Sequence, residues 1–153
     1  MTDLDQIMAV MDVAFDPHYR EAWSRRQVED SLELPTTFLL LADRSGEEPV
    51  EGSQAAGFIL ARQIIDEVEL LLIGVAPHHR GKGVGRKLLD RFEEFSLGRG
   101  AHKLFLEMRA NNPAENLYRS EGFRPIGRRR DYYRKLSGEH LDAITFEKRL
   151  KDS

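Results

Sequence analysis

The chain of 153 residues has a formal net charge of −3 and no cysteine. This length is that of one domain with its own core, so residues 1–153 are expected to form a single domain. Without cysteine, disulfides, thiolate metal sites and a cysteine nucleophile are excluded; His78 and His79 are adjacent, not an i, i+4 pair, so no metal site is expected. The acidic balance and the lack of a signal peptide or a long apolar run predict a cytoplasmic chain with no nucleic-acid or membrane partner.

Hydrophobic periodicity divides the chain into elements in the order ααβββαβαββ. As far as residue 76, it predicts two helices and three strands, over 3–15, 24–32, 36–43, 54–65 and 68–76. Beyond residue 76, it predicts a helix, a strand, a short helix and two strands, over 84–98, 102–109, 112–122, 123–133 and 141–150. Short connections favour antiparallel pairs and the helical crossover favours a parallel pair, so we expect an α+β fold with a mixed, mostly antiparallel sheet flanked by helices.

The short helix after residue 109 has a recognisable start. Asn112 precedes Pro113, and Glu115 follows Asn112 at the spacing of a capping box. Gly122 is expected to end the helix. The pattern therefore gives Asn112 a structural task as N-cap.

The segment APHHRGKGVGRK, residues 76–87, joins a buried strand to a helix. Its glycines let the backbone approach a ligand closely, and the first turn of the helix presents N–H groups and the positive end of the helix dipole. These features predict an anion site, although the letters fit neither a Walker loop nor a dinucleotide-binding loop. A glycine-rich turn whose basic residues balance nearby carboxylates is the alternative.

The stretch from Arg80 to Gly85, RGKGVG, resembles the Arg/Gln-x-x-Gly-x-Gly/Ala signature of the GNAT superfamily of N-acetyltransferases. The stretches LFLEMRANNPAENLYRSEGF and RRRDYY resemble its ribosomal-protein-alanine acetyltransferase (RimI) branch, so the likeness covers about residues 3–150. The resemblance implies the GNAT fold and acetyl-coenzyme A as co-substrate. It also implies that the strand Glu69–Val75 splays from the strand KLFLEMR and leaves a slot for pantetheine.

The resemblance assigns the coenzyme to residues around this slot. Strand backbone would meet the pantetheine and the acetyl end, and the glycine loop would hold the pyrophosphate. The implied coenzyme-binding residues are Ile73, Gly74, Val75, Arg80, Gly81, Lys82, Gly83, Val84, Gly85, Arg86, Asn111 and Asn112. Glycine inside a strand often marks a bulge or a close backbone approach, so Gly74 is a candidate for the bulge that opens the slot.

Acetyl transfer to an amine needs a base for the amine proton and an acid for the departing thiolate. Glu107 lies in an otherwise apolar strand, and the resemblance implies that it is the base. An ion pair with Arg109 or another arginine is the alternative. The matching tyrosine of the family protonates the sulfur, which gives Tyr118 that role, although its helical spacing also suits core packing.

Two departures from the family pattern affect the site and the sheet. One residue fewer separates Glu107 from Tyr118, so Asn112 keeps the spacing from the glutamate and Asn111 keeps the spacing to the tyrosine. The capping role of Asn112 favours Asn111 as the coenzyme contact. The chain also begins almost inside its first helix, so we expect the sheet to lack the family's N-terminal edge strand.

Trp23, Tyr132 and Tyr133 match positions that line the acceptor channel in peptide-acetylating relatives, with ordinary core or strand-end packing as the alternative. The resemblance implies direct transfer of acetyl, in a ternary complex, to the N-terminal amino group of a protein, such as the terminal alanine of a ribosomal protein. A small amine or lysine side chain as acceptor, or an acetyl-coenzyme A sensor without turnover, are the alternatives. The basic run from Arg124 to Lys135 is either a solvated face or a docking surface for an acidic partner.

Overall fold

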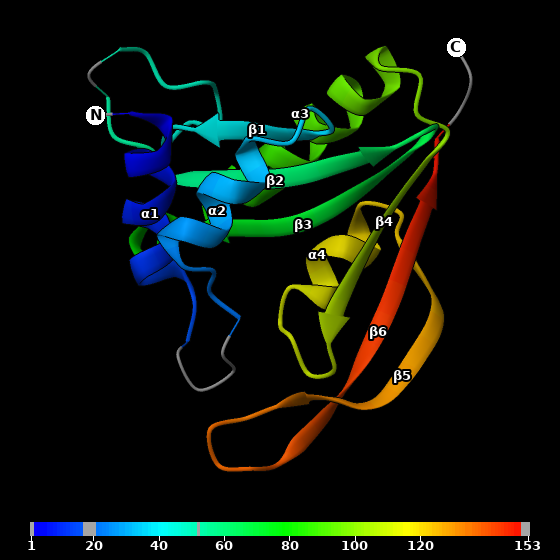
Figure 1. Cartoon of the computed structure of the whole chain (residues 1–153). Coiled ribbons are helices and arrows are strands. Elements are labelled where there is room, and N and C mark those ends of the chain that lie inside the picture. The colour runs from blue at the N-terminus through cyan, green and yellow to red at the C-terminus, as the bar shows by residue number, and fades with distance from the viewer. Residues whose placement is uncertain (1, 17–20, 52, 151–153) are drawn as a thin grey trace.

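The computed structural model of the chain describes residues 2–16, 21–51 and 53–150, and its elements follow the order predicted from the sequence (Figure 1). The α-helices of this described part are α1 (Asp3–Ala14), α2 (Arg25–Leu32), α3 (Val84–Gly98) and α4 (Glu115–Ser120). The strands are β1 (Thr37–Ala42), β2 (Gly57–Ile64), β3 (Glu67–Val75), β4 (Lys103–Arg109), β5 (Arg124–Arg134) and β6 (His140–Arg149). Among the described residues, none of the helices combines the length and the apolar character that a bilayer-spanning helix needs.

In the described part of the chain, the strands form one sheet in the order β1-β2-β3-β4-β6-β5. Neighbouring strands are antiparallel except β3 and β4, which are parallel because α3 connects them by a crossover. The predicted mixed, mostly antiparallel sheet is confirmed. β1 is an edge strand, and within the described ranges no strand precedes α1.

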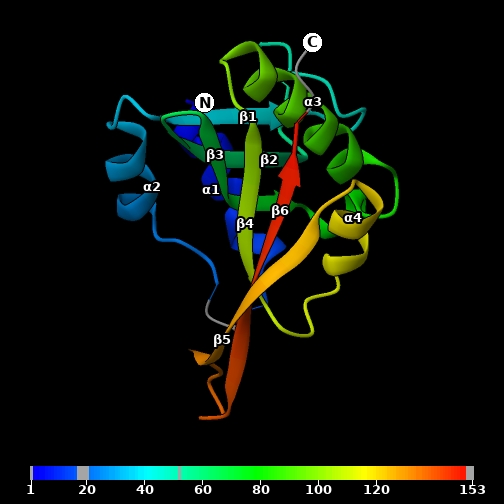
Figure 2. The ribbon, with the colours of Figure 1, turned by 90° about the vertical axis from the view of Figure 1, so that its right-hand side faces the viewer.

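Each face of the sheet carries its own apolar core. α3 and α4 cover one face (Figure 2), and the core beneath them includes Ile59, Leu88, Phe92, Leu106 and Tyr118. α1 and α2 cover the other face, and the core beneath them includes Ile7, Met11, Val28, Phe58 and Leu60. Because Phe58 and Ile59 are adjacent in β2 and belong to different cores, this strand is buried on both faces.

A β-bulge in β3 marks the point where the sheet opens. The register of β3 against β2 skips Leu71, which is the extra residue. Leu70 belongs to the core under α3 whereas Leu72 belongs to the core under α1, so the bulge changes the face that the side chains take. The parallel pairing of β3 with β4 ends at the same place, with Leu70 opposite Leu106. The expected splay of these two strands is confirmed.

The prediction of a bulge at Gly74 is wrong, and a different contact explains this glycine. Gly74 pairs in register with Phe58 of β2. A Cβ at Gly74 would lie 2.7 Å from Cε1 of Phe58, which is closer than packed atoms approach. Gly74 therefore serves the close backbone approach that a glycine inside a strand can also signal.

The predicted start of the short helix is also wrong. α4 begins at Glu115 with Ala114 as N-cap, and no side chain caps it. The Asn112 side chain instead accepts the N–H of Ala114 at 2.9 Å, which forms a turn before the helix. Glu115 binds Arg119 at 2.7 Å, one turn further on, so it does not reach back as a capping box requires. Asn112 still has a local structural task, but in a turn.

Candidate active site

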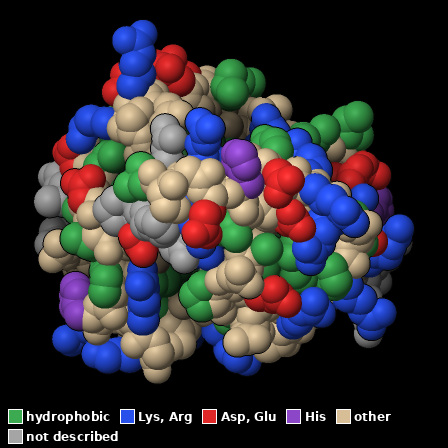
Figure 3. Space-filling model, turned by 90° about the horizontal axis from the view of Figure 1, so that it is seen from below, with side chains coloured by type: hydrophobic (Ala, Val, Ile, Leu, Met, Phe, Trp, Pro, Cys, Tyr) green, Lys and Arg blue, Asp and Glu red, His purple; other side chains and the backbone are tan. Residues whose placement is uncertain are grey.

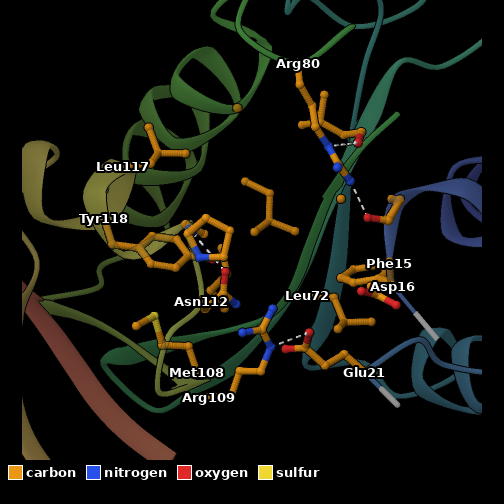
Figure 4. A pocket seen from close by; sticks show the side chains of 18 of the residues that line it. Phe15, Asp16, Glu21, Leu72, Arg80, Met108, Arg109, Asn112, Leu117 and Tyr118 are labelled. Atoms are coloured by element: carbon orange, nitrogen blue, oxygen red, sulfur yellow. Dashed lines mark hydrogen bonds and ion pairs between the residues drawn. The ribbon is translucent and has the colours of Figure 1, made fainter. Parts of the chain in front are cut away.

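A cavity of about 1110 Å³ lies where β3 and β4 separate (Figure 4). Its walls come from β3, the glycine loop, the end of β4, α4 and the residues that follow α1 and precede α2. The predicted site residues that line it are Trp23, Ile73, Gly74, Val75, Arg80, Gly81, Gly83, Val84, Gly85, Arg86, Glu107, Asn111, Asn112, Tyr118 and Tyr133. Lys82 and Tyr132 do not line it. One cavity thus joins most of the residues predicted to bind coenzyme, donate or accept protons, and contact the acceptor.

The glycine loop, residues 81–85, places the start of α3 at one end of the cavity. Gly81 and Gly83 have φ angles of +74° and +84°, which residues with a Cβ rarely adopt. Gly83 is the N-cap of α3 and no side chain caps it, so the first N–H groups of the helix remain available. A Cβ at either glycine would meet nothing within 4 Å. The loop therefore offers open space and N–H donors to an anion.

Arg80 begins the loop, but its guanidinium binds two backbone carbonyls (Figure 4). Nε donates to the Val75 carbonyl at 3.0 Å, and Nη2 donates to the Ala14 carbonyl. Arg80 thereby connects the end of β3 to the end of α1. A contact of Arg80 with pyrophosphate stays a prediction.

Exposed cations surround the glycine loop. The Arg86 side chain is 60% exposed and lies 3.6 Å from Glu121, and Lys82 makes no ion pair with any described residue. Desolvation, together with His78 and Lys82, lowers the pKa of His79, which lines the cavity beside Arg80. Within the described ranges, no three His, Asp or Glu side chains converge as a metal site requires.

Glu107 lies at the other end of the cavity and is paired with Arg129 of β5. Arg129 Nη2 donates to Oε1 at 2.6 Å and Nε donates to Oε2 at 3.0 Å, so both carboxylate oxygens are engaged. This pair raises the pKa of Arg129. The alternative of an ion pair is confirmed, with Arg129 as the partner and not Arg109. Glu107 also lines the cavity, so its role as base stays a prediction alongside the ion pair.

Tyr118 is 4% exposed and projects from α4 toward the cavity. Its ring packs edge to face against Phe123, with 5.9 Å between the centroids. Burial raises the pKa of the Tyr118 phenol, and the Glu21 carboxylate adds to this effect. A phenol that stays protonated can donate a proton in apolar surroundings. Tyr118 thus packs in the core and lines the cavity, and its role as acid stays a prediction.

Asn111 and Asn112 both line the cavity, but their side chains differ in what they bind. Asn112 accepts the N–H of Ala114, whereas no hydrogen bond among the described residues uses the Asn111 side chain. Asn111 has a φ of +69°, which asparagine tolerates better than most residues. The arrangement favours Asn111 as the residue with an amide to offer a ligand.

The acceptor residues divide between the cavity and the surface. Trp23 packs against the core under α1 and lines the cavity. Burial, followed by Glu107 and Glu21, raises the pKa of Tyr133 to about 12. Tyr132 is 52% exposed and lies outside the cavity, where its ring contacts the Arg129 guanidinium at 3.9 Å. Its ring also packs edge to face against the Tyr133 ring, with 5.3 Å between the centroids, so Tyr132 lies beside the cavity without lining it. The acceptor role of the two tyrosines stays a prediction.

Sequence reasoning missed an ion pair between two residues that line the cavity, Glu21 and Arg109. Arg109 Nε donates to Oε1 of Glu21 at 3.1 Å, and these side chains are only 8% and 19% exposed. Phe15 and Asp16 line the same wall. Strand alternation placed Arg109 beside Glu107, but no local signal could pair it with a residue 88 positions earlier.

The basic run from Arg124 to Lys135 lies on the exposed strand β5 and the turn after it. Arg128 pairs with Asp142 and Arg129 with Glu107, so part of its charge is neutralised. Figure 3 shows Lys and Arg side chains interspersed with acidic and apolar ones on the face seen from below. This supports a solvated face, and docking of an acidic partner stays a prediction.

Comparison with known proteins agrees with this geometry. The Acetyltransferase (GNAT) family model matches residues 5–123. The chain is 32% identical over 124 residues to the ribosomal protein bS18-alanine N-acetyltransferase of Haemophilus influenzae, covering 77% of this chain and 85% of that protein. The crystal structure of the ribosomal-protein-S18-alanine N-acetyltransferase from Escherichia coli matches with a TM-score of 0.82 at 28% identity, covering 100% of this chain and 91% of that one.

A second solved structure shares the fold at lower identity. Arabidopsis thaliana NAA60 in complex with acetyl-CoA matches with a TM-score of 0.68 at 22% identity, covering 84% of each chain. The expected resemblance to the ribosomal-protein-alanine branch and the GNAT fold are confirmed. This chain belongs to the GNAT family of acetyltransferases.

Proposed function

We propose that this chain is an acetyl-coenzyme A-dependent N-acetyltransferase that acetylates the N-terminal α-amino group of a protein. The proposed acceptor is the terminal alanine of a ribosomal protein. The observation that carries the proposal is that one cavity brings together the open start of α3 with Glu107, Tyr133 and Trp23. The Haemophilus influenzae relative, which is named for ribosomal protein bS18-alanine, supports this choice of acceptor.

The residues at the loop end fit the coenzyme. Gly81 and Gly83 leave space beside the uncapped start of α3, where N–H groups suit the pyrophosphate oxygens. Lys82 and Arg86 add exposed positive charge. Ile73 and Val75 lie where β3 has left β4, so their backbone groups can bind the pantetheine amides. When bound, the thioester supplies an acetyl group that an amine can attack.

The proposed proton transfers use Glu107 and Tyr118. An α-amino group has a pKa of about 8, so a carboxylate, directly or through a water, can take its proton as the amine attacks. Glu107 must share its oxygens with Arg129 when it does so, because both are engaged in the ion pair. Tyr118 keeps its proton because burial raises its pKa, and it donates that proton to the departing sulfur. We propose direct transfer, with donor and acceptor bound together.

The proposal is tested with acetyl-coenzyme A and a hexapeptide that begins with alanine. Thiol release and a mass gain of one acetyl group on the α-amine are expected. The same peptide with a blocked N-terminus and an internal lysine should release no thiol, and a polyamine should be a poor acceptor. Turnover only with the lysine peptide or the polyamine would show that the acceptor is a lysine side chain or a small amine. Tight coenzyme binding without turnover on any of these acceptors would indicate a sensor.

A further inference from the structure

We propose that Arg80 and Arg109 are positioning residues for the acceptor. They hold the acceptor wall, which we define as Phe15, Asp16, Glu21, Ala22 and Trp23, against the two strands that frame the slot. These wall residues line the cavity and lie next to α1 or α2. Only the kinetic readout of this proposal rests on the proposed function.

Arg80 holds the first end of the wall. Its guanidinium donates to the carbonyl of Val75, the last residue of β3, and to the carbonyl of Ala14, the last residue of α1. Phe15, the first wall residue, follows Ala14 directly. A planar guanidinium with several fixed donors can bridge two carbonyls, which lysine cannot do in the same geometry. The direction in which the chain leaves α1 is therefore tied to the end of β3.

Arg109 holds the second end of the wall. It is the last residue of β4, and it binds Glu21 with both side chains largely buried. A buried ion pair is costly to break because each charge is left without its partner. Trp23 lies two residues after Glu21 and packs on the core under α1. The direction in which the chain approaches α2 is therefore tied to the end of β4.

We call the contact of Arg80 with Ala14 and the contact of Arg109 with Glu21 the two ties, and they lie on opposite sides of the slot (Figure 4). β3 and β4 stop pairing at Leu70 and Leu106, and the coenzyme slot opens between their later residues. Arg80, which follows the end of β3, binds the residue directly before the wall, and Arg109, which ends β4, binds Glu21 within it. The wall is thus fixed to both sides of the slot, and its side chains are held in register with the place where acetyl is offered.

This role differs from a phosphate contact in what it controls. If Arg80 served mainly to bind pyrophosphate, its loss would weaken coenzyme affinity. If Arg80 instead holds the wall in place, its loss shifts the wall, raises the KM for the acceptor peptide and leaves the affinity for coenzyme nearly unchanged. Lys82 is the matched comparison because it lies two residues away, makes no ion pair among the described residues and does not line the cavity.

The experiment compares Arg80→Gln, Arg109→Gln and Glu21→Gln with Lys82→Gln and with Arg26→Gln, a surface control on α2. Glu21→Gln removes the same ion pair as Arg109→Gln from its more exposed side, so it serves if Arg109→Gln fails to fold. Calorimetry gives the coenzyme A affinity, thiol release gives the KM of the alanine peptide, and acrylamide quenching reports on Trp23. Trp23 is the single tryptophan in the sequence, so its emission follows the wall without needing turnover.

The tie variants, which are Arg80→Gln, Arg109→Gln and Glu21→Gln, are expected to raise the KM for the peptide about tenfold or more, because small displacements of a positioning group have large kinetic effects. They should increase quenching of Trp23 and change coenzyme affinity by less than about twofold, whereas Lys82→Gln should weaken coenzyme binding alone. Unchanged quenching and unchanged peptide KM in the tie variants would overturn the proposal, as would a loss confined to coenzyme affinity. Increased quenching without turnover in any protein would uphold the ties while the proposed function fails.

Discussion

The two ends of the cavity are built in different ways. The end that we propose for the coenzyme is formed by backbone, because Gly81 and Gly83 hold positive φ angles and leave the start of α3 open. The end that we propose for the acceptor is formed by side chains held in ion pairs, with Glu107 bound to Arg129 and Glu21 bound to Arg109. A backbone site depends on a few adjacent glycines, whereas a side-chain site depends on contacts between distant elements. Substitutions should therefore damage the two ends in different ways.

The largest expected effect is at the acceptor end. Glu107→Gln should lower kcat by about 10²- to 10⁴-fold, the range for loss of a general base, with unchanged coenzyme affinity. Steady-state thiol release with the alanine peptide measures kcat, and calorimetry measures the affinity. Glu139→Gln, which removes an exposed glutamate from the β5 to β6 turn, should have no effect. Equal activity of Glu107→Gln and the native protein from about pH 6 to 9 would show that Glu107 is not the general base.

The next largest effect tests the strand between the two ends. Gly74→Ala should lower the free energy of unfolding by about 1–3 kcal/mol, as overpacking does, because its Cβ would collide with Phe58. Urea unfolding measures the change. Gly127→Ala in β5 is the matched control, since a Cβ there meets nothing within 4 Å. Equal unfolding midpoints for the two variants would show that Phe58 moves aside.

A smaller effect is expected at the coenzyme end. Gly83→Val should weaken coenzyme A binding roughly tenfold, because a positive φ costs a side-chain residue about 1–2 kcal/mol and the loop would change shape. The open space around Gly83 means that strain, not a clash within the protein, is the cause. Gly98→Ala at the end of α3 should bind coenzyme normally. Unchanged calorimetric affinity in Gly83→Val would remove the glycine loop from the coenzyme site.

The smallest effect appears only in alkali. Burial raises the pKa of Tyr133 from its ordinary 10 to about 12, so its neutral form is favoured in the folded state. A raised pKa gives stability that is complete below pH 10 and is lost as the pH rises toward the folded value. Urea midpoints should therefore fall above pH 10, and Tyr133→Phe should make this fall shallower. An identical pH dependence in the variant would show that the phenol ionises freely in the folded protein.

The contrast between the two ends also explains what could be predicted from the sequence. The glycine loop and the crossover that makes β3 and β4 parallel are local patterns, so they were predictable. The partner of Glu107 was not, because Arg129 lies 22 positions away and strand alternation favours the nearer Arg109. The prediction of a capping box at Asn112 was wrong because an asparagine can either cap a helix or close a turn, and the sequence pattern is the same in both cases.

The short parallel pairing of β3 with β4 has a consequence for self-association. Beyond Leu70 and Leu106, both strands present N–H and C=O groups that pair with no described strand across the gap. Unpaired strand edges are templates on which other chains can add and aggregate. Here the open edges lie inside the sheet, with α4 and the residues after α1 along the cavity walls. The molecule can therefore offer these backbone groups to a narrow, extended ligand, while another folded protein cannot pair with them as it could with an exposed edge strand.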